Sequence, residues 1–237
     1  MREDTDAVTI SFPMKLRSIG SLAVVSFVLL RDVSGQDFQN LDFESANLSP
    51  IPLGQFGGFV PITNALSGWT GYLGATQVTQ VLQDNLTLGS GSIDILGPDW
   101  AFGGSSVIDG QYSVELQPGL NNTPSAFAAT IAQIGMIPIT AKSLQFKKAP
   151  TEDPFSVTIG GQAISMIPLQ NSSTYILYGG DISIFAGLTE ELRMSALPGT
   201  FGFSLDDIVF SPSSVPEPNT LGLIALGALL FSLRRSK

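Results

Sequence analysis

The chain has 237 residues and a mass of 25.0 kDa, and its 20 acidic and 11 basic residues give a formal net charge of −9. It contains neither Cys nor His, which excludes disulfides, thiolate metal sites, His-ligated metals and a Ser-His-Asp triad. The acidic balance also argues against nucleic acid as a partner, because neutralising phosphates requires clustered Lys and Arg.

Residues 14–35 are typical of an export signal peptide. A short basic start precedes a stretch of 13 apolar or small residues over 18–30, and small residues precede a cleavage site before Gln36. Residues 1–13 are acidic and unlike the start of such a signal, so we interpret them as a misassigned extension ahead of a true start at Met14. The alternative is that the apolar stretch is a buried helix of a cytosolic domain.

Residues 36–212 predict one all-β domain, an antiparallel β-sandwich or jelly roll. Apolar and polar residues alternate in eight or nine short segments with turn signals between them, which is typical of these architectures. The alternating residues are Ile93 and Ile95; Val114 and Leu116; Leu144 and Phe146; Phe155, Val157 and Ile159; Ile164 and Met166; Tyr175 to Tyr178; Ile182 and Ile184; Leu192 and Met194; and Phe201, Phe203 and Leu205.

Several segments of this domain are less regular. Residues 124–135 could form a short helix, but the surrounding pattern favours a strand, and the Pro-, Gly- and Ser-rich residues 45–68 predict a long loop. Three lysines over 142–148 are too few for a binding stripe and predict a solvated strand or loop. Turns are expected at Gly97 to Asp99, Asp109-Gly110, Pro118-Gly119, Gly179 to Asp181 and Pro198-Gly199.

Three aromatic residues in Gly-rich segments are candidates for ligand binding. Trp69 and Tyr72 belong to Ser-Gly-Trp-Thr-Gly-Tyr, and Trp100 lies before Ala-Phe-Gly-Gly. On loops, such side chains can form flat platforms for sugar rings, although a Trp beside a turn more often closes the end of a sandwich core. Polar side chains that could hold sugar hydroxyls there are Asn64, Gln77 and Asp99.

Carboxylates gather at the two ends of the predicted domain, with Glu44 near its start and Asp206 and Asp207 in its last strand. Apolar residues take odd positions up to Leu205 and even positions from Ile208, so the alternation slips by one and predicts a β-bulge between them. In either phase one Asp faces the core, where an unpaired carboxylate costs several kcal/mol. A bound Ca²⁺ would offset that cost, since it prefers hard oxygen ligands.

The two ends of the domain resemble the galactose-binding-like jelly rolls, a fold shared by many bacterial carbohydrate-binding modules. The resemblance rests on an opening Asn40-x-x-Phe43-Glu44 and a closing Leu-Asp206-Asp207-Ile. It implies that the first and last strands are neighbours, and that Glu44 with Asp206 or Asp207 ligates a structural Ca²⁺. The alternative is that the two Asp residues cap an edge strand in water.

Residues 213–237 have the features of a second targeting signal, in addition to the export signal peptide. The motif Val215-Pro216-Glu217-Pro218 is followed by 15 uncharged residues over 219–233, which predict a transmembrane helix. The basic tail 234–237, with Arg234 and Arg235, is expected to stay in the cytoplasm by the positive-inside rule. The apolar stretch is short of the ~20 residues that usually span a bilayer.

Motif, helix and basic tail in this order resemble the PEP-CTERM sorting signal of Gram-negative bacteria. The resemblance implies transient retention in the inner membrane and cleavage by an exosortase near the motif, Val215 to Pro218. The domain would then reach the cell surface or the extracellular space, where such proteins often accompany exopolysaccharide. The alternative is an ordinary hydrophobic anchor that contains Pro-Glu-Pro by chance.

These features leave three functions open. We expect an exported, non-catalytic surface or matrix protein, with a carbohydrate-binding module as the alternative. A glycoside hydrolase acting through paired carboxylates is disfavoured, because no active-site motif is present and the domain lacks the size and loops of such enzymes. Residues 36–212 hold 15 acids and 4 bases, a net charge of −11, which suits an extracytoplasmic space with divalent cations rather than an anionic membrane surface.

The first testable prediction concerns the mature N-terminus. Cleavage of the signal peptide should leave Gln36, within a few residues, as the first residue of the exported protein. N-terminal sequencing or intact-mass measurement of that protein checks this. An exported product that still carries Met1 would contradict the export interpretation.

Overall fold

The computed structural model describes residues 36–216, apart from 53, 86, 88, 99–106, 120–126 and 199–200. The expected N-terminal extension, the signal peptide and the predicted C-terminal helix lie outside these residues. The described residues contain one helical turn, α1 (Ile62–Ala65), and one 3₁₀ helix, η1 (Ser183–Phe185). None of their helices is long and apolar enough to cross a membrane.

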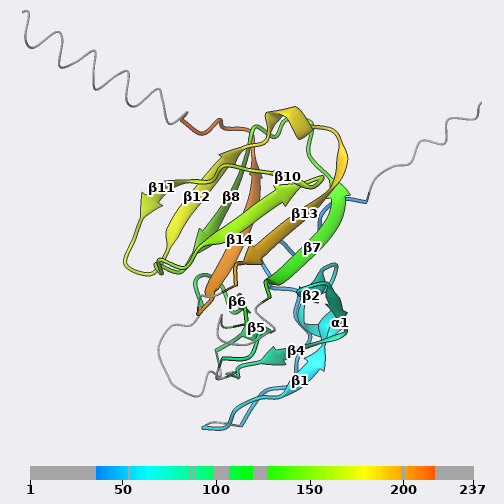
Figure 1. Ribbon diagram of the computed structural model, residues 1–237, viewed down its shortest axis with the longest axis vertical. Coiled ribbons are helices and arrows are strands. Elements are labelled where there is room, and N and C mark those ends of the chain that lie inside the picture. The colour runs from blue at the N-terminus through cyan, green and yellow to red at the C-terminus, as the bar shows by residue number, and fades with distance from the viewer. Residues whose placement is uncertain are drawn as a thin grey trace, which may run out of the picture. The chain divides into compact units, whose positions relative to one another are not determined.

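The strands form two sheets, as the predicted sandwich requires (Figure 1). Neighbouring strands are antiparallel except β4 and β5, which are parallel. The six-stranded sheet has the order β10 (Gln162–Ala163), β9 (Phe155–Ile159), β13 (Thr189–Ala196), β7 (Ala129–Met136), β2 (Thr70–Leu73) and β3 (Thr76–Val78). The eight-stranded sheet has the order β1 (Phe59–Pro61), β4 (Gln80–Gln83), β5 (Ser92–Leu96), β6 (Ser113–Gln117), β14 (Phe203–Ser211), β8 (Ser143–Lys148), β12 (Ile176–Asp181) and β11 (Ile167–Asn171).

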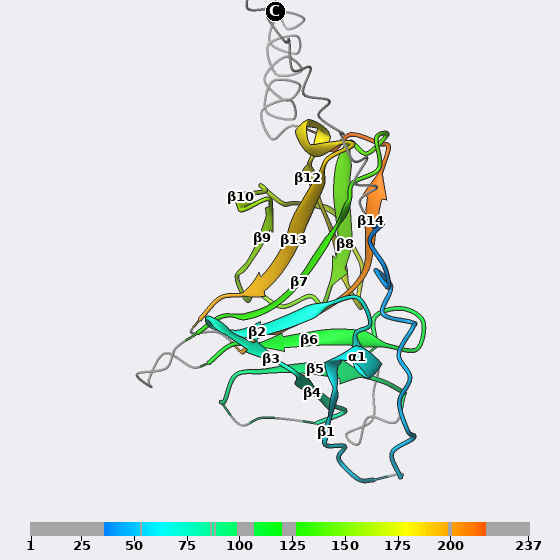
Figure 2. The ribbon, with the colours of Figure 1, turned by 90° about the vertical axis from the view of Figure 1, so that its right-hand side faces the viewer.

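A shared hydrophobic core lies between the sheets (Figure 2). The alternating residues of the sequence supply it: Leu144 and Phe146 of β8 are fully buried, as are Leu192 of β13 and Leu205 of β14. This follows from the period of two along a strand, which places every second side chain on the same face. The strand favoured for residues 124–135 is confirmed from residue 129 onward, as β7.

Three local expectations were wrong. The turn expected at Gly179 to Asp181 lies inside β12, and the residues expected in a strand around Ser183 form η1. The glycines of β12 instead mark a close approach, because a Cβ on Gly179 would lie 2.6 Å from Leu169 Cδ1. The segment 45–68 is not one loop, since it contains β1 and α1.

The sequence also suggested that the lysines of β8 are solvated, and the structure contradicts this expectation. Lys148 is 1% exposed, and its ammonium donates to the carbonyl oxygen of Thr151 at 2.7 Å and to Thr151 Oγ1 at 2.9 Å. It lies 5.1 Å from the ring centroid of Phe203 and 5.8 Å from that of Phe155. Burial lowers the pKa of Lys148, while nearby carboxylates partly oppose that effect. The side chain therefore belongs to the structure of the sandwich and not to its surface.

Candidate functional site

The structure brings together the carboxylates that the sequence placed at the two ends of the domain. Asp42, Glu44, Asp109, Asp206 and Asp207 line a cavity of about 200 Å³ together with Gly110; we call it the acidic pocket. The predicted bulge is confirmed, because the pairing of β14 with β8 shifts between Asp206 and Val209, and Asp207 has a φ of 48°. One Asp is buried, as expected: Asp206 is 1% exposed.

Hydrogen-bond donors of the protein already engage two carboxylates of the acidic pocket, those of Asp206 and Glu44. Asp206 Oδ2 accepts hydrogen bonds from Ser113 Oγ at 2.7 Å and from the backbone N–H of Asp109 at 3.1 Å. Burial nevertheless raises the pKa of Asp206 to about 7. Glu44 Oε1 accepts the backbone N–H groups of Gln111 at 2.8 Å and Tyr112 at 3.0 Å.

A glycine makes the contact with Glu44 possible. Gly110 has a φ of 59°, and a Cβ at this position would lie 2.2 Å from Glu44 Oε1. The opening segment is also tied directly to the last strand, since the N–H of Ile208 donates to the carbonyl oxygen of Leu41 at 3.0 Å. The opening segment and the last strand are therefore neighbours. The resemblance implied that the first strand would be the neighbour, but the opening segment is not a strand, and β1 lies at the edge of the eight-stranded sheet, away from β14.

Lys147 of β8 supplies a positive charge that the sequence did not assign to this site. Its ammonium forms ion pairs with Asp109 and, at 2.9 Å, with Asp207. Burial alone would lower the pKa of Lys147, but the hydrogen bonds to these two carboxylates outweigh burial and raise it. The same contact lowers the pKa of Asp109. The acidic pocket is thus partly neutralised by the chain itself.

The fit of Ca²⁺ to the acidic pocket is mixed. Its five carboxylates are hard oxygen donors of the kind that Ca²⁺ prefers. As they stand, however, the described residues contain no group of three or more acidic side chains that could hold a metal ion. Lys147 occupies the position between Asp109 and Asp207 where a cation would interact most strongly. The calcium ligation expected of Glu44 and Asp206 or Asp207 stays a prediction.

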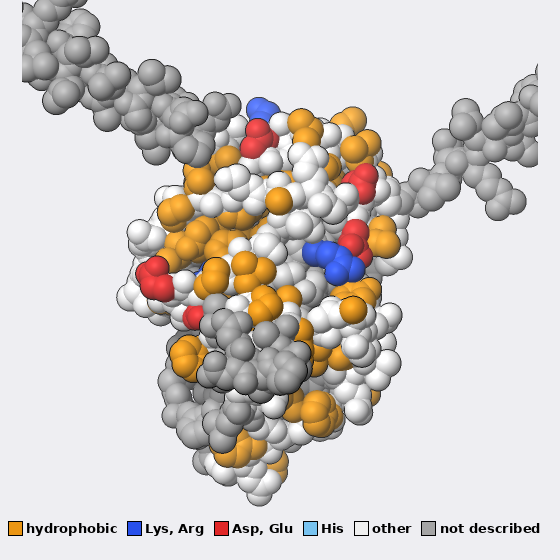
Figure 3. Space-filling model, viewed as in Figure 1, with side chains coloured by type: hydrophobic (Ala, Val, Ile, Leu, Met, Phe, Trp, Pro, Cys, Tyr) orange, Lys and Arg blue, Asp and Glu red, His pale blue; other side chains and the backbone are white. Residues whose placement is uncertain are grey.

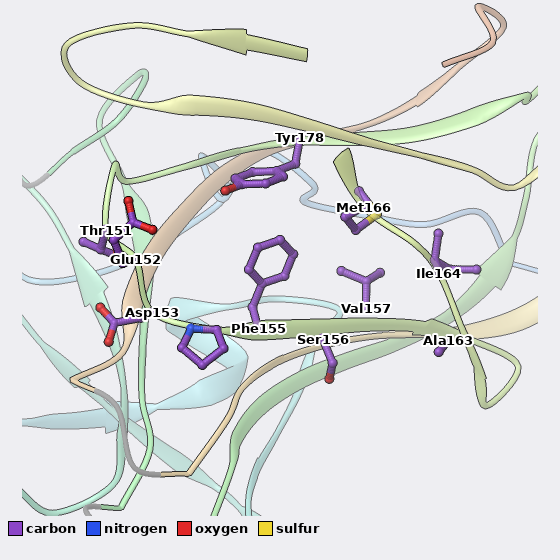
Figure 4. A pocket seen from close by; sticks show the side chains of 11 residues that line it. Thr151, Glu152, Asp153, Phe155, Ser156, Val157, Ala163, Ile164, Met166 and Tyr178 are labelled. Carbon is purple, nitrogen blue, oxygen red and sulfur yellow. The ribbon is translucent and has the colours of Figure 1, made fainter. Parts of the chain in front are cut away.

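A second cavity, of about 370 Å³, opens between the edges of the two sheets (Figure 4). We call it the edge cleft. Phe155 of β9 and Tyr178 of β12 line it and contact each other edge to face, with ring centroids 4.9 Å apart and an angle of 74° between the rings. The segment between β10 and β11 closes one end with Ile164 and Met166 (Figure 4).

The other end of the edge cleft is polar. The chain from Thr151 to Asp153 lines it, with two adjacent carboxylates at Glu152 and Asp153. Burial, and to a smaller extent the charge of Glu152, raises the pKa of Tyr178. The edge cleft therefore combines aromatic walls, a phenolic hydroxyl and two carboxylates within a volume typical of small-molecule sites.

The aromatic residues singled out in the sequence do not form this cleft. Trp69 is 4% exposed, packs on Phe43 and donates its indole N–H to the carbonyl oxygen of Asn40 at 2.9 Å. It is a core residue and cannot offer a stacking platform. Tyr72 lies on β2, with the guanidinium of Arg193 4.7 Å from its ring centroid, and Trp100 lies outside the described residues.

A third group of carboxylates lies around β5: Asp94 of β5 and Asp84, which follows β4, are buried, and Glu115 of β6 is half-buried. Asp94 is 2% exposed, its Oδ1 has no hydrogen-bond partner among the described atoms, and it lies opposite Glu115 in the strand register. Burial raises the pKa of Asp94 to about 8, and the charges of Glu115 and Asp84 add to that effect. Burial also raises the pKa of Glu115. Asp94 lies between the core residues Ile93 and Ile95 of β5. The alternation of apolar and polar residues predicts an exposed side chain at this position, so its burial was not evident from the sequence.

Comparison with known proteins identifies the C-terminal segment. A protein-family model described as the PEP-CTERM protein-sorting motif matches residues 214–236. The match confirms the sorting signal predicted from the sequence and implies export and exosortase processing. No curated protein matches the chain.

Among solved structures, the enzymatically active domain of tailspike protein 4 from bacteriophage CBA120 matches with a TM-score of 0.36 and 16% sequence identity. The alignment covers 60% of this chain and 19% of the tailspike chain. A likeness at this level carries no inference about function.

The buried state of Asp94 predicts a pH dependence of stability. Its folded-state pKa of about 8 lies above the ordinary value of 3.8 for an Asp carboxyl, so the folded state binds the proton more tightly than the unfolded state does. The free energy of unfolding should therefore fall as the pH rises from about 4 to about 8, by up to about 1.4 kcal/mol per pH unit for this group. Urea unfolding at a series of pH values measures it.

Asp94→Asn should flatten the decline over this window, because the amide does not ionise. Asp181→Asn, at an exposed carboxylate of β12, is the matched control and should leave the decline unchanged. If wild type and Asp94→Asn decline in parallel, Asp94 is ionised in the folded protein and the assignment is wrong.

Proposed function

We propose that the chain is an exported, non-catalytic protein whose β-sandwich acts at the cell surface or in the extracellular matrix, in association with exopolysaccharide. The match of residues 214–236 to the sorting motif carries this proposal. The structure adds that the motif begins directly after the sandwich. Val215 still packs on β12, where a Cβ on Gly179 would lie 2.8 Å from Val215 Cγ1, whereas Pro216 is exposed. A processing enzyme would therefore meet the motif at the edge of a folded domain.

The chemistry of the described residues favours a non-catalytic role. The chain has no His or Cys to act as a base or nucleophile near neutral pH. In the acidic pocket, Glu44 and Asp206 accept backbone N–H groups, and Asp109 and Asp207 pair with Lys147. Carboxylates held in this way serve the packing of loops better than they serve proton transfer to a substrate.

The sorting proposal predicts a change in processing when the motif is altered. In a host that carries the matching exosortase, the extracellular form should lack the segment after Pro218, with the inner membrane holding only the precursor. Pro216→Ala combined with Glu217→Ala should leave a longer, membrane-bound form, because the enzyme no longer recognises the motif. Immunoblots of membrane and medium fractions with intact-mass analysis measure this.

A substitution that spares the motif is the control for this experiment. Ser213→Ala with Ser214→Ala alters the residues just ahead of it and should be processed like the wild type. If wild type and the Pro216/Glu217 variant remain equally intact in the membrane, residues 219–233 are a plain anchor and the sorting proposal fails.

The edge cleft supports carbohydrate binding as a second candidate function. Sugar rings stack on aromatic faces, and their hydroxyls donate to carboxylates, which are the groups that Phe155, Tyr178, Glu152 and Asp153 bring to the cleft. This candidate keeps the resemblance of the end motifs to galactose-binding-like jelly rolls, but moves the ligand site away from Trp69.

A glycan array with the exported protein tests this candidate. Tyr178→Phe should weaken binding of a retained glycan about fivefold, since one hydrogen bond is worth about 1 kcal/mol, and Glu152→Gln should weaken it further by removing a charge. Tyr175→Phe, at a half-buried tyrosine outside the cleft lining, is the control. Binding that survives both cleft variants unchanged would place the glycan elsewhere, and an empty array would leave the purely structural role.

We further propose that Ca²⁺ binds in the acidic pocket through Glu44 and Asp206 or Asp207, in competition with the ammonium of Lys147. The five carboxylates and one lysine of this region leave a net negative charge that a divalent cation would offset. Binding to the folded state alone would raise the melting temperature by mass action.

The calcium proposal predicts opposite effects of two kinds of substitution. Millimolar Ca²⁺ should raise the melting temperature of the wild type relative to a chelator, and Lys147→Met should enlarge that rise by removing the competing charge. Glu44→Gln should abolish it, as should one of Asp206→Asn and Asp207→Asn. If neither the wild type nor Lys147→Met responds to Ca²⁺, Lys147 is the only cation that the pocket requires.

A further inference from the structure

Three aliphatic side chains are exposed together at one end of the sandwich. Ile139 is 83% exposed, Ile184 is 68% exposed and Leu188 is 46% exposed. Exposed apolar residues that are scattered singly need no explanation, but contiguous ones mark interaction surfaces. We call these three residues the apolar tip.

Backbone contacts place Leu188 beside the segment that carries Ile139, and Ile184 lies in η1, four residues before Leu188. The N–H of Ile137 donates to the carbonyl oxygen of Leu188, and the N–H of Gly187 donates to the carbonyl oxygen of Ile137, both at 2.9 Å. A Cβ on Gly187 would lie 3.7 Å from Ile139 Cγ1. Hydrophobic atoms gather around η1 at this end of the surface in Figure 3, where η1 is located by its place in Figure 1.

The local structure keeps these side chains exposed. Ile182, which directly precedes η1, and Phe185 of η1 are 0% and 8% exposed, so the short helix is anchored to the core at both ends. Ile184 lies between them and therefore points outward. The exposure is thus a consequence of a fixed turn and not of a loosely packed loop.

Both ends of the folded domain leave it at the apolar tip. The N–H of Lys142 donates to the carbonyl oxygen of Ser211 at 2.8 Å, and the N–H of Ile182 donates to that of Lys142 at 3.0 Å. At the other terminus, the N–H of Met136, next to Ile137, donates to the carbonyl oxygen of Gln36 at 2.9 Å. The sorting motif and the expected mature N-terminus therefore attach to the same end of the sandwich.

The length of the connecting chain limits how far this end can lie from a membrane. Only four residues separate Pro216, the last described residue, from Leu221, where the apolar run of the sorting segment begins. Even when fully extended, five residue steps span no more than about 17 Å. While the sorting segment is held in the bilayer, the end of the sandwich that carries the apolar tip must lie near the lipid headgroups.

We propose that the apolar tip inserts into the lipid surface of the membrane that retains the sorting segment, before the domain is released. This inference rests on the proposed retention of residues 219–233 in the membrane. Moving aliphatic side chains into the boundary between headgroups and acyl chains is favourable. The membrane-held sorting segment also keeps the apolar tip at a high effective concentration beside the lipid surface. The contact would hold Pro216 and the motif after it at the bilayer surface, where a membrane enzyme can reach them.

Charge does not drive this contact. Lys142 is the basic residue nearest to the apolar tip, and Asp181 of β12 lies close by with an exposed carboxylate. The domain as a whole is acidic, so attraction to anionic lipid is weak, and insertion should depend little on salt. A lipid surface that accepts apolar side chains, rather than a polyanion, is therefore the partner that fits.

Single cysteines give a direct test, because the natural chain contains none. The exported chain with its sorting segment intact is reconstituted into phosphatidylethanolamine–phosphatidylglycerol vesicles that contain doxyl-labelled lipid. An environment-sensitive fluorophore is placed by Ile139→Cys or Ile184→Cys. Phe59→Cys is the matched control, since Phe59 is 69% exposed and lies on β1, at the other end of the molecule from η1 in Figures 1 and 2.

Labels at positions 139 and 184 should be quenched several-fold more strongly than the label at 59, equally at low and high salt. A second variant, Ile139→Asp with Ile184→Asp, should remove the quenching of a label at Leu188→Cys without changing flotation of the protein with the vesicles. Unchanged melting temperatures show that these variants fold.

The possible failures are distinct. If the protein floats with vesicles but positions 139 and 184 are quenched no more than position 59, the tip contact is refuted while membrane retention stands. If the protein does not float, the proposed retention fails and the tip contact fails with it. Labels that are shielded only in host membranes containing the exosortase would show a protein partner at the tip, which also overturns insertion into lipid.

Discussion

The sandwich depends on the last strand, β14, which lies in the middle of the eight-stranded sheet. Its first residues pair with β6 and the remainder with β8, so it joins the two halves of that sheet. Its pairing with β8 is interrupted by the bulge after Asp206, and the carboxylate of Asp206 is buried there, where hydrogen bonds from Ser113 and the loop at Asp109 hold it. Because Asp109 lies in the loop before β6 and Ser113 is the first residue of β6, these hydrogen bonds also tie that loop of the acidic pocket to the last strand.

The two cavities of the domain differ in what lines them. In the acidic pocket, backbone N–H groups and Lys147 engage the carboxylates, so a ligand there has to compete with the protein. In the edge cleft, Thr151 accepts hydrogen bonds from Lys148, Asp153 Oδ1 accepts the N–H of Phe201 at 3.1 Å, and aromatic side chains lie beside these polar residues (Figure 4). The acidic pocket thus joins the start of the domain to its last strand, whereas the edge cleft lies between strands of the two sheets.

The arrangement of the chain ends connects the fold with export. Because both termini leave the domain at the same end, a membrane signal at either terminus can hold the folded domain at that end. The opposite end of the sandwich then points away from the membrane. The edge strands of both sheets are short, such as β10 with two residues and β1 with three, which limits pairing between copies during transit.

The sequence by itself determined what depends on local pattern: most strands, the slip at Asp206-Asp207, and the sorting signal, since alternation, bulges and apolar runs are written along a few consecutive residues. The local pattern wrongly predicted a turn at Gly179 and Gly180, because no neighbouring residue in the sequence indicates that Leu169 and Met166 pack against that strand. Only the tertiary structure decided that Lys147 enters the acidic pocket, that Trp69 fills the core and that Phe155 meets Tyr178 in the lining of a cleft. These contacts join residues far apart in the chain, and the packing of two sheets selects them.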